Sequence, residues 1–343
     1  MKFRQVGLNK WNIFPIFLAL VFSLNTSFAD NAEDISSVMY PTHLLKLDNK
    51  YNHHVLIAEK STHKLYIYAN DNGTPKFVRA FNVATGKITG DKYVQGDRKT
   101  PEGIYSFSKF LPSEKIIKMY GQETGKIYGA GAFVTSYPNL IDRISGKTGG
   151  GIWLHSPHDP ARVSKGLDSR GCVVVVDQDL KDISRYIELQ NTPIIVVQNL
   201  SFLHASAWKQ KKEDIVQLIE NWRNSWQNEN LDSYLSAYHK TEFSHPHKGR
   251  NFQLFKNYKS RVFSGPGKPD ISIEHLSIVT HDGHAFVTFN QAYKSNHIDD
   301  VGRKSMILKM DSSYNWKIVH ESWHKIPTKE DDRVAFSPSM RFF

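Results

Sequence analysis

The chain has 343 residues, of which 40% are hydrophobic and 23% charged, values that are typical of folded globular proteins. This length is enough for two domains. The net charge of +10 favours polyanionic surroundings. The sequence has no zinc-finger spacing, no RNA-binding signature and no concentrated lysine or arginine block, so no nucleic-acid partner is expected.

The first 29 residues have the pattern of a secretory signal peptide. The basic residues within 1–10 precede an apolar run at 13–24, and Ser27-Phe28-Ala29 offers small residues at a cleavage site. The apolar run is shorter than the roughly 20 residues that a membrane-spanning helix needs. We therefore expect export to the periplasm, with no stable membrane span once 1–29 is removed.

The next part of the chain predicts a domain rich in short strands. Residues 30–51 are expected to form an irregular N-terminal extension with one helical stretch at 32–39, and 109–128 to form a flap. Short runs of β-branched and aromatic residues between turn residues favour a sandwich or barrel over a parallel sheet. The predicted strands are 54–58, 64–68, 77–83, 104–107, 152–154, 173–176 and 193–197, with a helix at 179–189.

The pattern changes after residue 199. Residues 200–211 are expected to form a linker, and 326–343 a C-terminal tail. Between them, apolar residues recur at helical spacing over 214–238, which predicts helices. The strands that follow are predicted at 271–278, 285–293, 304–310 and 316–322. Helices followed by a curled antiparallel sheet indicate an α+β fold.

Cys172 is the only cysteine in the sequence, so an internal disulfide is impossible. It lies directly before an apolar strand, and His155 ends the strand before it. Two such strand ends can present a nucleophile and its base at one sheet edge. A thiolate is the attacking species of a cysteine enzyme, and a neighbouring imidazole can take its proton and return it to a leaving amine. Gly171 permits a sharp turn whose amides, from Arg170 to Cys172, are expected to face a developing oxyanion.

These residues resemble the catalytic motif of the L,D-transpeptidase family, also called the YkuD domain. The motif has His-Ser, here His155-Ser156, and later Ser-x-Gly-Cys, here Ser169 to Cys172. Lys64 to Tyr68 resembles an early strand of that domain, and Thr85-Gly86 with Thr100 to Gly103 resembles its TG…TPxG stretch. The resemblance covers 52–199.

The resemblance implies a β-sandwich enzyme that acts on the peptide stems of peptidoglycan. Cys172 would attack the carbonyl of meso-diaminopimelate in a tetrapeptide and expel the terminal D-alanine, with His155 as base. The Ser156 carbonyl would orient the imidazole, and Ser169, Arg170 and Gly171 would form the oxyanion and substrate-binding turn. No cofactor and no metal are implied, and a homodimer is left open.

The sequence departs from the family pattern at two positions. Arg170 stands where the family usually has His, and Val174 where it usually has Arg or Asn. Neither is the nucleophile or its base. The family's polar side chain at 174 could hold donor or acceptor, so its absence here leaves the choice of acceptor open.

Residues 212–325 resemble the NTF2-like, or SnoaL-like, fold, which forms a cone-shaped pocket. The residues that carry this likeness are the Trp222 to Trp226 helix, Tyr234 to Tyr238, and the last strand at Trp316 to Val319. The pairing of the two domains resembles the cell-shape L,D-carboxypeptidases of curved and helical Gram-negative bacteria. It favours hydrolysis to a tripeptide over formation of 3-3 crosslinks or attachment of a protein to the wall.

Two other interpretations compete with a cysteine enzyme. A non-catalytic wall-binding protein would have no reason to keep its only cysteine in this setting. A metal-dependent hydrolase would have to use His155, His158 and Asp159, whose spacing matches no known ligand signature.

Overall fold

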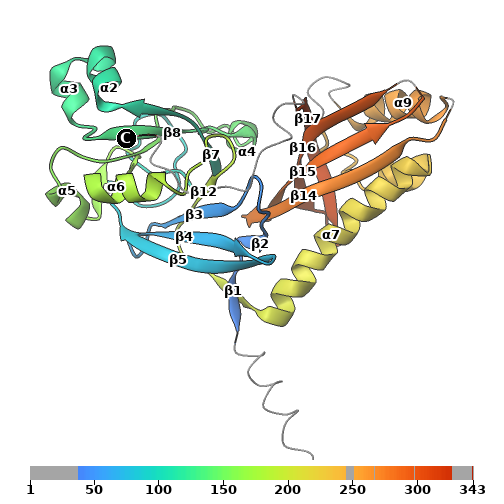
Figure 1. Cartoon of the computed structure of the whole chain (residues 1–343), viewed down its shortest axis with the longest axis horizontal. Coiled ribbons are helices and arrows are strands. Elements are labelled where there is room, and N and C mark those ends of the chain that lie inside the picture. The colour runs from blue at the N-terminus through green and yellow to red at the C-terminus, as the bar shows by residue number, and fades with distance from the viewer. Residues whose placement is uncertain (1–37, 245–250, 266, 297, 327–341, 343) are drawn as a thin grey trace, which may run out of the picture. The chain divides into compact units, whose positions relative to one another are not determined.

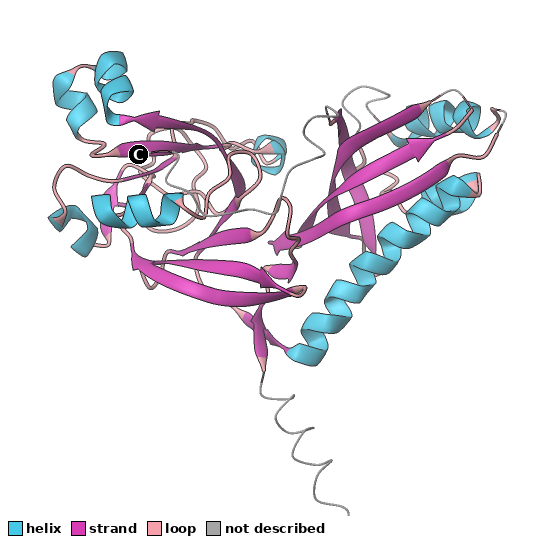
Figure 2. Cartoon of the chain, in the orientation of Figure 1, coloured by secondary structure: helices cyan, strands magenta, loops and turns pink. Residues whose placement is uncertain are grey.

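The computed structural model describes residues 38–244, 251–265, 267–296, 298–326 and 342. The predicted signal peptide and most of the predicted helix at 32–39 and of the tail lie outside these residues. Within the described ranges, no helix combines the length and the apolar character needed to cross a bilayer. Figure 1 labels the elements, and Figure 2 separates helices from strands by colour.

The first domain is built on an eight-stranded mixed sheet with the strand order β11-β9-β8-β7-β12-β3-β4-β5. All of the strands predicted for it are present, although several differ in length. Their bounds are β3 (His54–Glu59), β4 (Lys64–Asp71), β5 (Thr74–Asn82), β7 (Gly103–Pro112), β8 (Gly131–Thr135), β9 (Trp153–His155), β11 (Val173–Val174) and β12 (Pro193–Val197).

The two ends of this sheet share one hydrophobic core, so the sheet folds over on itself. Leu65 on β4 and Leu154 on β9 are fully buried in the same cluster. Helix α6 (Asp177–Ser184) covers this core with Leu180 and Ile183. The helix was predicted at 179–189; it begins two residues earlier and ends sooner.

Short helices and loops surround the sheet near β8 and β9. The predicted flap contains α2 (Ser113–Tyr120) and α3 (Gln122–Lys126), separated by Gly121, whose φ of +84° favours glycine. The remaining short elements are α4 (Leu140–Ile144), α5 (Ala161–Ser164), β6 (Thr85–Gly86) and β10 (Leu167–Ser169). Strands β6 and β10 pair in parallel.

The second domain packs helices against a five-stranded antiparallel sheet of order β17-β16-β15-β14-β2, which confirms the predicted α+β fold. Its core is rich in aromatic residues, among them Trp222, Tyr234 and Phe255. The bounds are α7 (Ala205–Gln227), α8 (Leu231–Ser236), α9 (Phe252–Phe263), β14 (Asp270–His281), β15 (His284–Lys294), β16 (Asp299–Met310) and β17 (Trp316–Lys325).

The predicted N-terminal extension and linker both contain regular structure where the chain is described. Strand β1 (Met39–Pro41) pairs with β13 (Phe202–His204), and α7 begins directly after β13. Strand β2 (Leu44–Lys46) is the edge strand of the second domain's sheet. The reason is local: Leu44 and Leu45 point to opposite faces of β2 and are buried in different hydrophobic clusters.

A polar network lies inside the core of the second domain. The Lys304 ammonium is 2.8 Å from the Glu321 carboxylate, and both side chains are almost fully buried. The Tyr238 hydroxyl donates to the same carboxylate at 3.0 Å and accepts a hydrogen bond from Trp222 Nε1 at 2.8 Å. The Tyr234 and Tyr238 hydroxyls lie 2.7 Å apart. Buried polar groups that find such partners fix one arrangement of the core.

Candidate active site

The edge strand β11 and its neighbour β9 bring Cys172 and His155 to one face of the sheet. β9 ends at His155, and Cys172 directly precedes β11. The two strands pair in parallel, with Val174 opposite His155 and Val173 opposite Leu154. This register sets Cys172 opposite Trp153, two residues from His155 and on the same face, because side chains alternate along a strand. The sequence predicted two strand ends at one sheet edge, whereas in this parallel pair the end of β9 lies two residues from the start of β11.

His155 is held in one tautomer by its neighbour. Its side chain is buried, with 3% of the residue exposed, and Nδ1 lies 2.9 Å from the Ser156 carbonyl oxygen. A carbonyl only accepts hydrogen bonds, so Nδ1 carries the proton and Nε2 keeps its lone pair. This is the contact that the family resemblance implied for Ser156.

The resting site pairs a neutral thiol with a neutral imidazole. Burial lowers the pKa of His155 to about 4 and raises the pKa of the Cys172 thiol to about 11. Cys172 is half-buried, and its Sγ lies 3.5 Å from the Gly151 carbonyl oxygen, which can accept the thiol proton. With pKa values on these sides of neutrality, both groups are uncharged near pH 7.

The turn before the cysteine is fixed by one serine. Ser169 Oγ donates to the Cys172 carbonyl at 2.6 Å and accepts from the Gly171 amide at 3.0 Å. The expectation that the Gly171 amide faces the oxyanion is therefore wrong, because that N–H is already bonded to Ser169. Gly171 has φ +127°, and an added Cβ would lie 2.8 Å from the Lys99 carbonyl oxygen, so only glycine fits.

Ser156 also connects the site to the flap. Its hydroxyl is fully buried and accepts a hydrogen bond from the Ala130 amide at 2.9 Å. Two residues earlier, the Tyr128 ring lies 4.9 Å from the His155 ring and 4.8 Å from the Trp153 ring, between centroids. The segment that follows the flap helices thus forms one wall of the site.

Two residues close to the candidate pair were not predicted: Tyr128 and Arg162. The Arg162 Nε bonds to Asp168 Oδ2 at 2.5 Å, and the guanidinium charge acts to lower the pKa of both His155 and Cys172. Burial raises the pKa of Tyr128, and the charges of Arg170 and Arg162 oppose this shift. Both arginines therefore belong to the surroundings of the catalytic pair. Neither Tyr128 nor Arg162 belongs to a recognisable motif, so the sequence offered no signal for them.

The alternative metal site has no support in the geometry. Among the residues for which the structure gives positions, no group of three or more His, Cys, Asp or Glu side chains could hold a metal ion. His158, which this interpretation requires, is exposed. Cys172 and the oriented ring of His155 remain the candidate catalytic pair.

Comparison with known families agrees with this class of site. Residues 53–196 match the profile of the L,D-transpeptidase catalytic domain, and residues 214–322 match the profile of the Cds6 C-terminal NTF2-like domain. The chain therefore combines an L,D-transpeptidase (YkuD) catalytic domain with a C-terminal NTF2-like domain.

Solved structures show the same two-domain combination. Bd1075 from Bdellovibrio bacteriovorus is 29% identical and aligns with a TM-score of 0.73 over 85% of this chain and 100% of its own. The helical cell shape determining protein Pgp2 from Campylobacter jejuni is 25% identical, with a TM-score of 0.62 over 84% of this chain and 97% of its own. None of the curated proteins matches the sequence.

Proposed function

We propose that this protein is an exported L,D-carboxypeptidase that cleaves the bond between meso-diaminopimelate and the terminal D-alanine of tetrapeptide stems. The observation that carries the proposal is the hydrogen bond from His155 Nδ1 to the Ser156 carbonyl, beside Cys172 on the adjacent strand. This contact leaves Nε2 as the only basic ring nitrogen that can receive the thiol proton.

Acylation then follows from the two neutral groups. His155 Nε2 takes the proton of Cys172 as Sγ bonds to the diaminopimelate carbonyl carbon. The carbon–nitrogen bond breaks, and the imidazolium returns the proton to the departing D-alanine amine. The amides of Arg170 and Cys172 remain as donors for the oxyanion, since the Gly171 amide is bonded to Ser169.

Water completes the reaction in this proposal. His155 removes a proton from water as its oxygen bonds to the thioester carbon. The carbon–sulfur bond breaks, which releases the tripeptide and restores the Cys172 thiol. The alternative is attack by an amine of a second stem, which gives a 3-3 crosslink. The pairing of this catalytic domain with an NTF2-like domain favours hydrolysis, because it resembles the cell-shape L,D-carboxypeptidases.

The similarity to a cell shape determining protein supports a role in shaping the wall. We place the protein in the periplasm on the basis of the signal-peptide pattern at 1–29. The NTF2-like domain is assigned a binding role, in which it positions the enzyme on the anchored polymer.

The test is incubation of the full chain with purified disaccharide tetrapeptides, followed by mass analysis. A tripeptide with free D-alanine supports the proposal, whereas a dimer joined between two diaminopimelates identifies a transpeptidase. Cys172→Ala should abolish both products without loss of the fold. Turnover by that variant at the wild-type rate would exclude the cysteine mechanism.

A further inference from the structure

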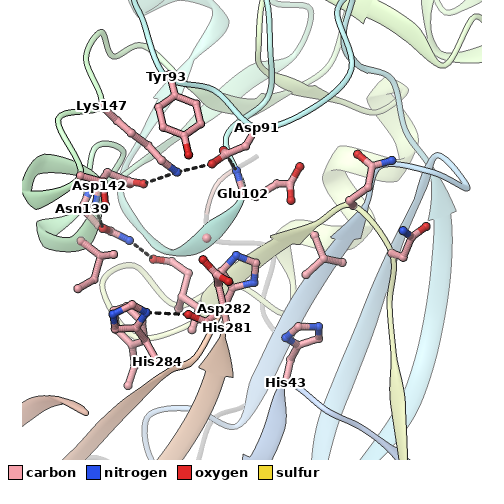
Figure 3. A pocket seen from close by; sticks show the side chains of 18 of the residues that line it. His43, Asp91, Tyr93, Glu102, Asn139, Asp142, Lys147, His281, Asp282 and His284 are labelled. Atoms are coloured by element: carbon pink, nitrogen blue, oxygen red, sulfur yellow. Dashed lines mark hydrogen bonds and ion pairs between the residues drawn. The ribbon is translucent and has the colours of Figure 1, made fainter. Parts of the chain in front are cut away.

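A cavity of about 490 Å³ lies apart from the catalytic pair, and neither Cys172 nor His155 lines it. It is formed by loops of the first domain and by the turn between β14 and β15. Its volume falls within the range of small-molecule sites, roughly 300–1,000 Å³. Figure 3 shows the two sets of polar side chains that face one another across it: Asp91, Glu102, Asp142 and Lys147 from the first domain, and His281, Asp282 and His284 from the turn, with His43 beside them.

The first set is anchored by internal ion pairs. Lys147 Nζ lies 2.6 Å from Asp91 and 3.1 Å from Asp142. Glu102 is paired with Lys60 at 2.8 Å. These contacts fix the carboxylates in place and leave further oxygen lone pairs of Asp91 and Glu102 available, because each ionised carboxylate has about four acceptor positions.

The second set contains a buried imidazole with an unused acceptor. His43 is 9% exposed, and its Nδ1 lies 2.8 Å from the Thr280 carbonyl oxygen. Since a carbonyl only accepts, Nδ1 carries the proton and Nε2 is a bare lone pair. Nε2 is buried and has no hydrogen-bond partner within the described part of the chain. Burial of an acceptor without a hydrogen-bond donor lowers the stability of the fold, unless a ligand supplies the donor.

His281 adds a second unused ring nitrogen close to the first. The His43 and His281 ring centroids are 5.9 Å apart. His281 Nδ1 is also buried without a hydrogen-bond partner in the described ranges. Burial lowers the pKa of both rings, that of His43 to about 4, so both are neutral at physiological pH and each can offer a lone pair.

The charged side chains that line the cavity are mainly negative, whereas the whole protein has a positive net charge. Four carboxylates line it, but Lys147 is the only lysine or arginine among the residues that do so. The chain as a whole carries +10. A metal ion does not explain this excess of acceptors, because no described cluster has a metal-binding arrangement. The chemistry that fits is a ligand with several N–H donors and a positive charge.

We propose that this cavity binds a primary ammonium group, with the neutral ring nitrogens of His43 and His281 and the carboxylate of Asp282 as acceptors. An ammonium group has three N–H donors and no acceptor, which matches this set. The inference rests on the proposed function for its natural ligand: the free side-chain amine of meso-diaminopimelate in a neighbouring stem.

The loops that line the cavity continue to the catalytic turn. The Thr148 amide donates to the Tyr93 carbonyl at 2.8 Å, and this ties the loop that carries Lys147 to the loop that carries Asp91. Further along the same two loops, the Gly151 carbonyl accepts from Cys172, and the Lys99 carbonyl backs Gly171. A peptide stem bound in the cavity would therefore contact the same loops that line the active site.

The experiment titrates the full chain, in the Cys172→Ala form so that nothing is turned over, with Nα-acetyl-L-lysine amide. The matched ligand is the same molecule acetylated at its side-chain amine, which removes the charge and two donors. Imidazole resonances assigned to His43 and His281 are followed by NMR. Intact disaccharide tetrapeptide and its amine-acetylated form are then titrated in the same way.

We expect the ammonium ligands to shift the His43 and His281 resonances, and their acetylated forms to bind at least tenfold more weakly, equivalent to about 1.4 kcal/mol. Asp282→Asn should weaken binding roughly two- to fivefold, as for a partly exposed charge pair. Asp270→Asn, an exposed carboxylate outside the cavity, should not.

Equal binding of the acetylated ligands, or unchanged affinity in Asp282→Asn, would overturn the ammonium site. Shifts confined to histidines elsewhere, such as His320, would do the same. Failure of the proposed function is scored separately by the absence of D-alanine release from the wild-type enzyme. Binding by the lysine probe alone, without the tetrapeptide, would retain the ammonium site but reject the stem as its ligand.

Discussion

At the scale of single residues, the chemistry depends on which group holds a proton before substrate arrives. Burial holds the pKa of His155 at about 4 and that of Cys172 at about 11, so neither group is charged near neutrality. An ion pair formed in advance would require the opposite order of pKa values. This order of pKa values favours the proposed proton transfer to His155 Nε2 during attack.

The pH dependence of acylation follows from these two pKa values. Below about pH 4 the imidazole is protonated and cannot act as base, so the rate should fall as pH drops through that value. Above about pH 11 the thiol is ionised, and no proton is left to give to the leaving amine. Between them the rate should be nearly constant, from about pH 6 to 9. The rate of Cys172 acylation by a penem can be measured at each pH from the intact mass of the protein. A tenfold rise in this rate per pH unit between 7 and 9 would indicate a free thiol instead.

His155→Ala should reduce acylation by about 10² to 10⁴, the usual scale of general acid–base catalysis. It should also give the pH dependence of a free thiol. His158→Ala is the matched control, because His158 is exposed and three residues further along the same loop. An equal loss in both variants would show that His155 is not the base.

Gly171→Ala tests the turn before the nucleophile. The added Cβ would lie 2.8 Å from the Lys99 carbonyl oxygen and 2.9 Å from Ile152 Cδ1, in a backbone conformation that favours glycine. We expect a loss of about 1–3 kcal/mol in the free energy of unfolding, with acylation reduced further because Cys172 moves. Gly150→Ala, where an added Cβ meets open space, should leave unfolding unchanged in a thermal melt. Wild-type acylation by Gly171→Ala would show that this geometry is not needed.

At the scale of elements, the strands that carry the motif were predictable and several others were not. Hydrophobic runs bounded by turn residues predicted β9, β11 and β12 within one or two residues. Helix α9 was not predicted, although its sequence includes Phe252, Leu254, Phe255, Val262 and Phe263; of these only Phe255 is fully buried. Helix α7 starts at Ala205, earlier than predicted. Its first turns are rich in lysine, and this charged stretch was interpreted as a linker.

Some features of the candidate active site were likewise predictable from the sequence, and others were not. The motif named Cys172 and His155 as the candidate pair, and it predicted the Ser156 carbonyl contact because Ser156 directly follows His155 in the chain. Tyr128 and Arg162 reach the site from separate loops, and only the folded chain brings them there. Ser169 was predicted for the oxyanion turn, but its hydroxyl takes up the Gly171 amide, which depends on backbone directions that no residue pattern encodes.

The polar network of the NTF2-like core gives a second prediction at this scale. Tyr238→Phe removes a hydroxyl that accepts from Trp222 and donates to Glu321, so a buried donor and a buried carboxylate lose a partner. The expected cost is about 1–3 kcal/mol in the free energy of unfolding. Chemical denaturation monitored by tryptophan fluorescence measures it. Tyr314→Phe, at a position that is 84% exposed, should change nothing, and an equal effect in both would argue against the network.

At the scale of the whole molecule, β2 connects the two hydrophobic cores. Leu45 is buried in the core of the NTF2-like domain, whereas Leu44 is buried in a cluster with Val55 and Ile57 of β3 and with Val279 of β14. Removal of the second domain would take away the partner strand of β2 and expose this cluster. Truncation therefore cannot separate a binding role from a structural one, and substitutions within the intact chain are the better test of either.

The shared cluster predicts that the two domains unfold together. Leu44→Ala should cost about 2–5 kcal/mol, because it opens a cavity at a fully buried position. Two reporters distinguish the domains: Cys172 is the only cysteine and reports the first, while most of the seven tryptophans follow residue 205 and report the second. Thiol reactivity and tryptophan fluorescence should therefore show coincident thermal transitions, both shifted equally by Leu44→Ala. Leu254→Ala, at a position that is 53% exposed on α9, should shift neither. Separate transitions, or a shift in one reporter alone, would mean that β2 belongs to one domain only and that the domains fold independently.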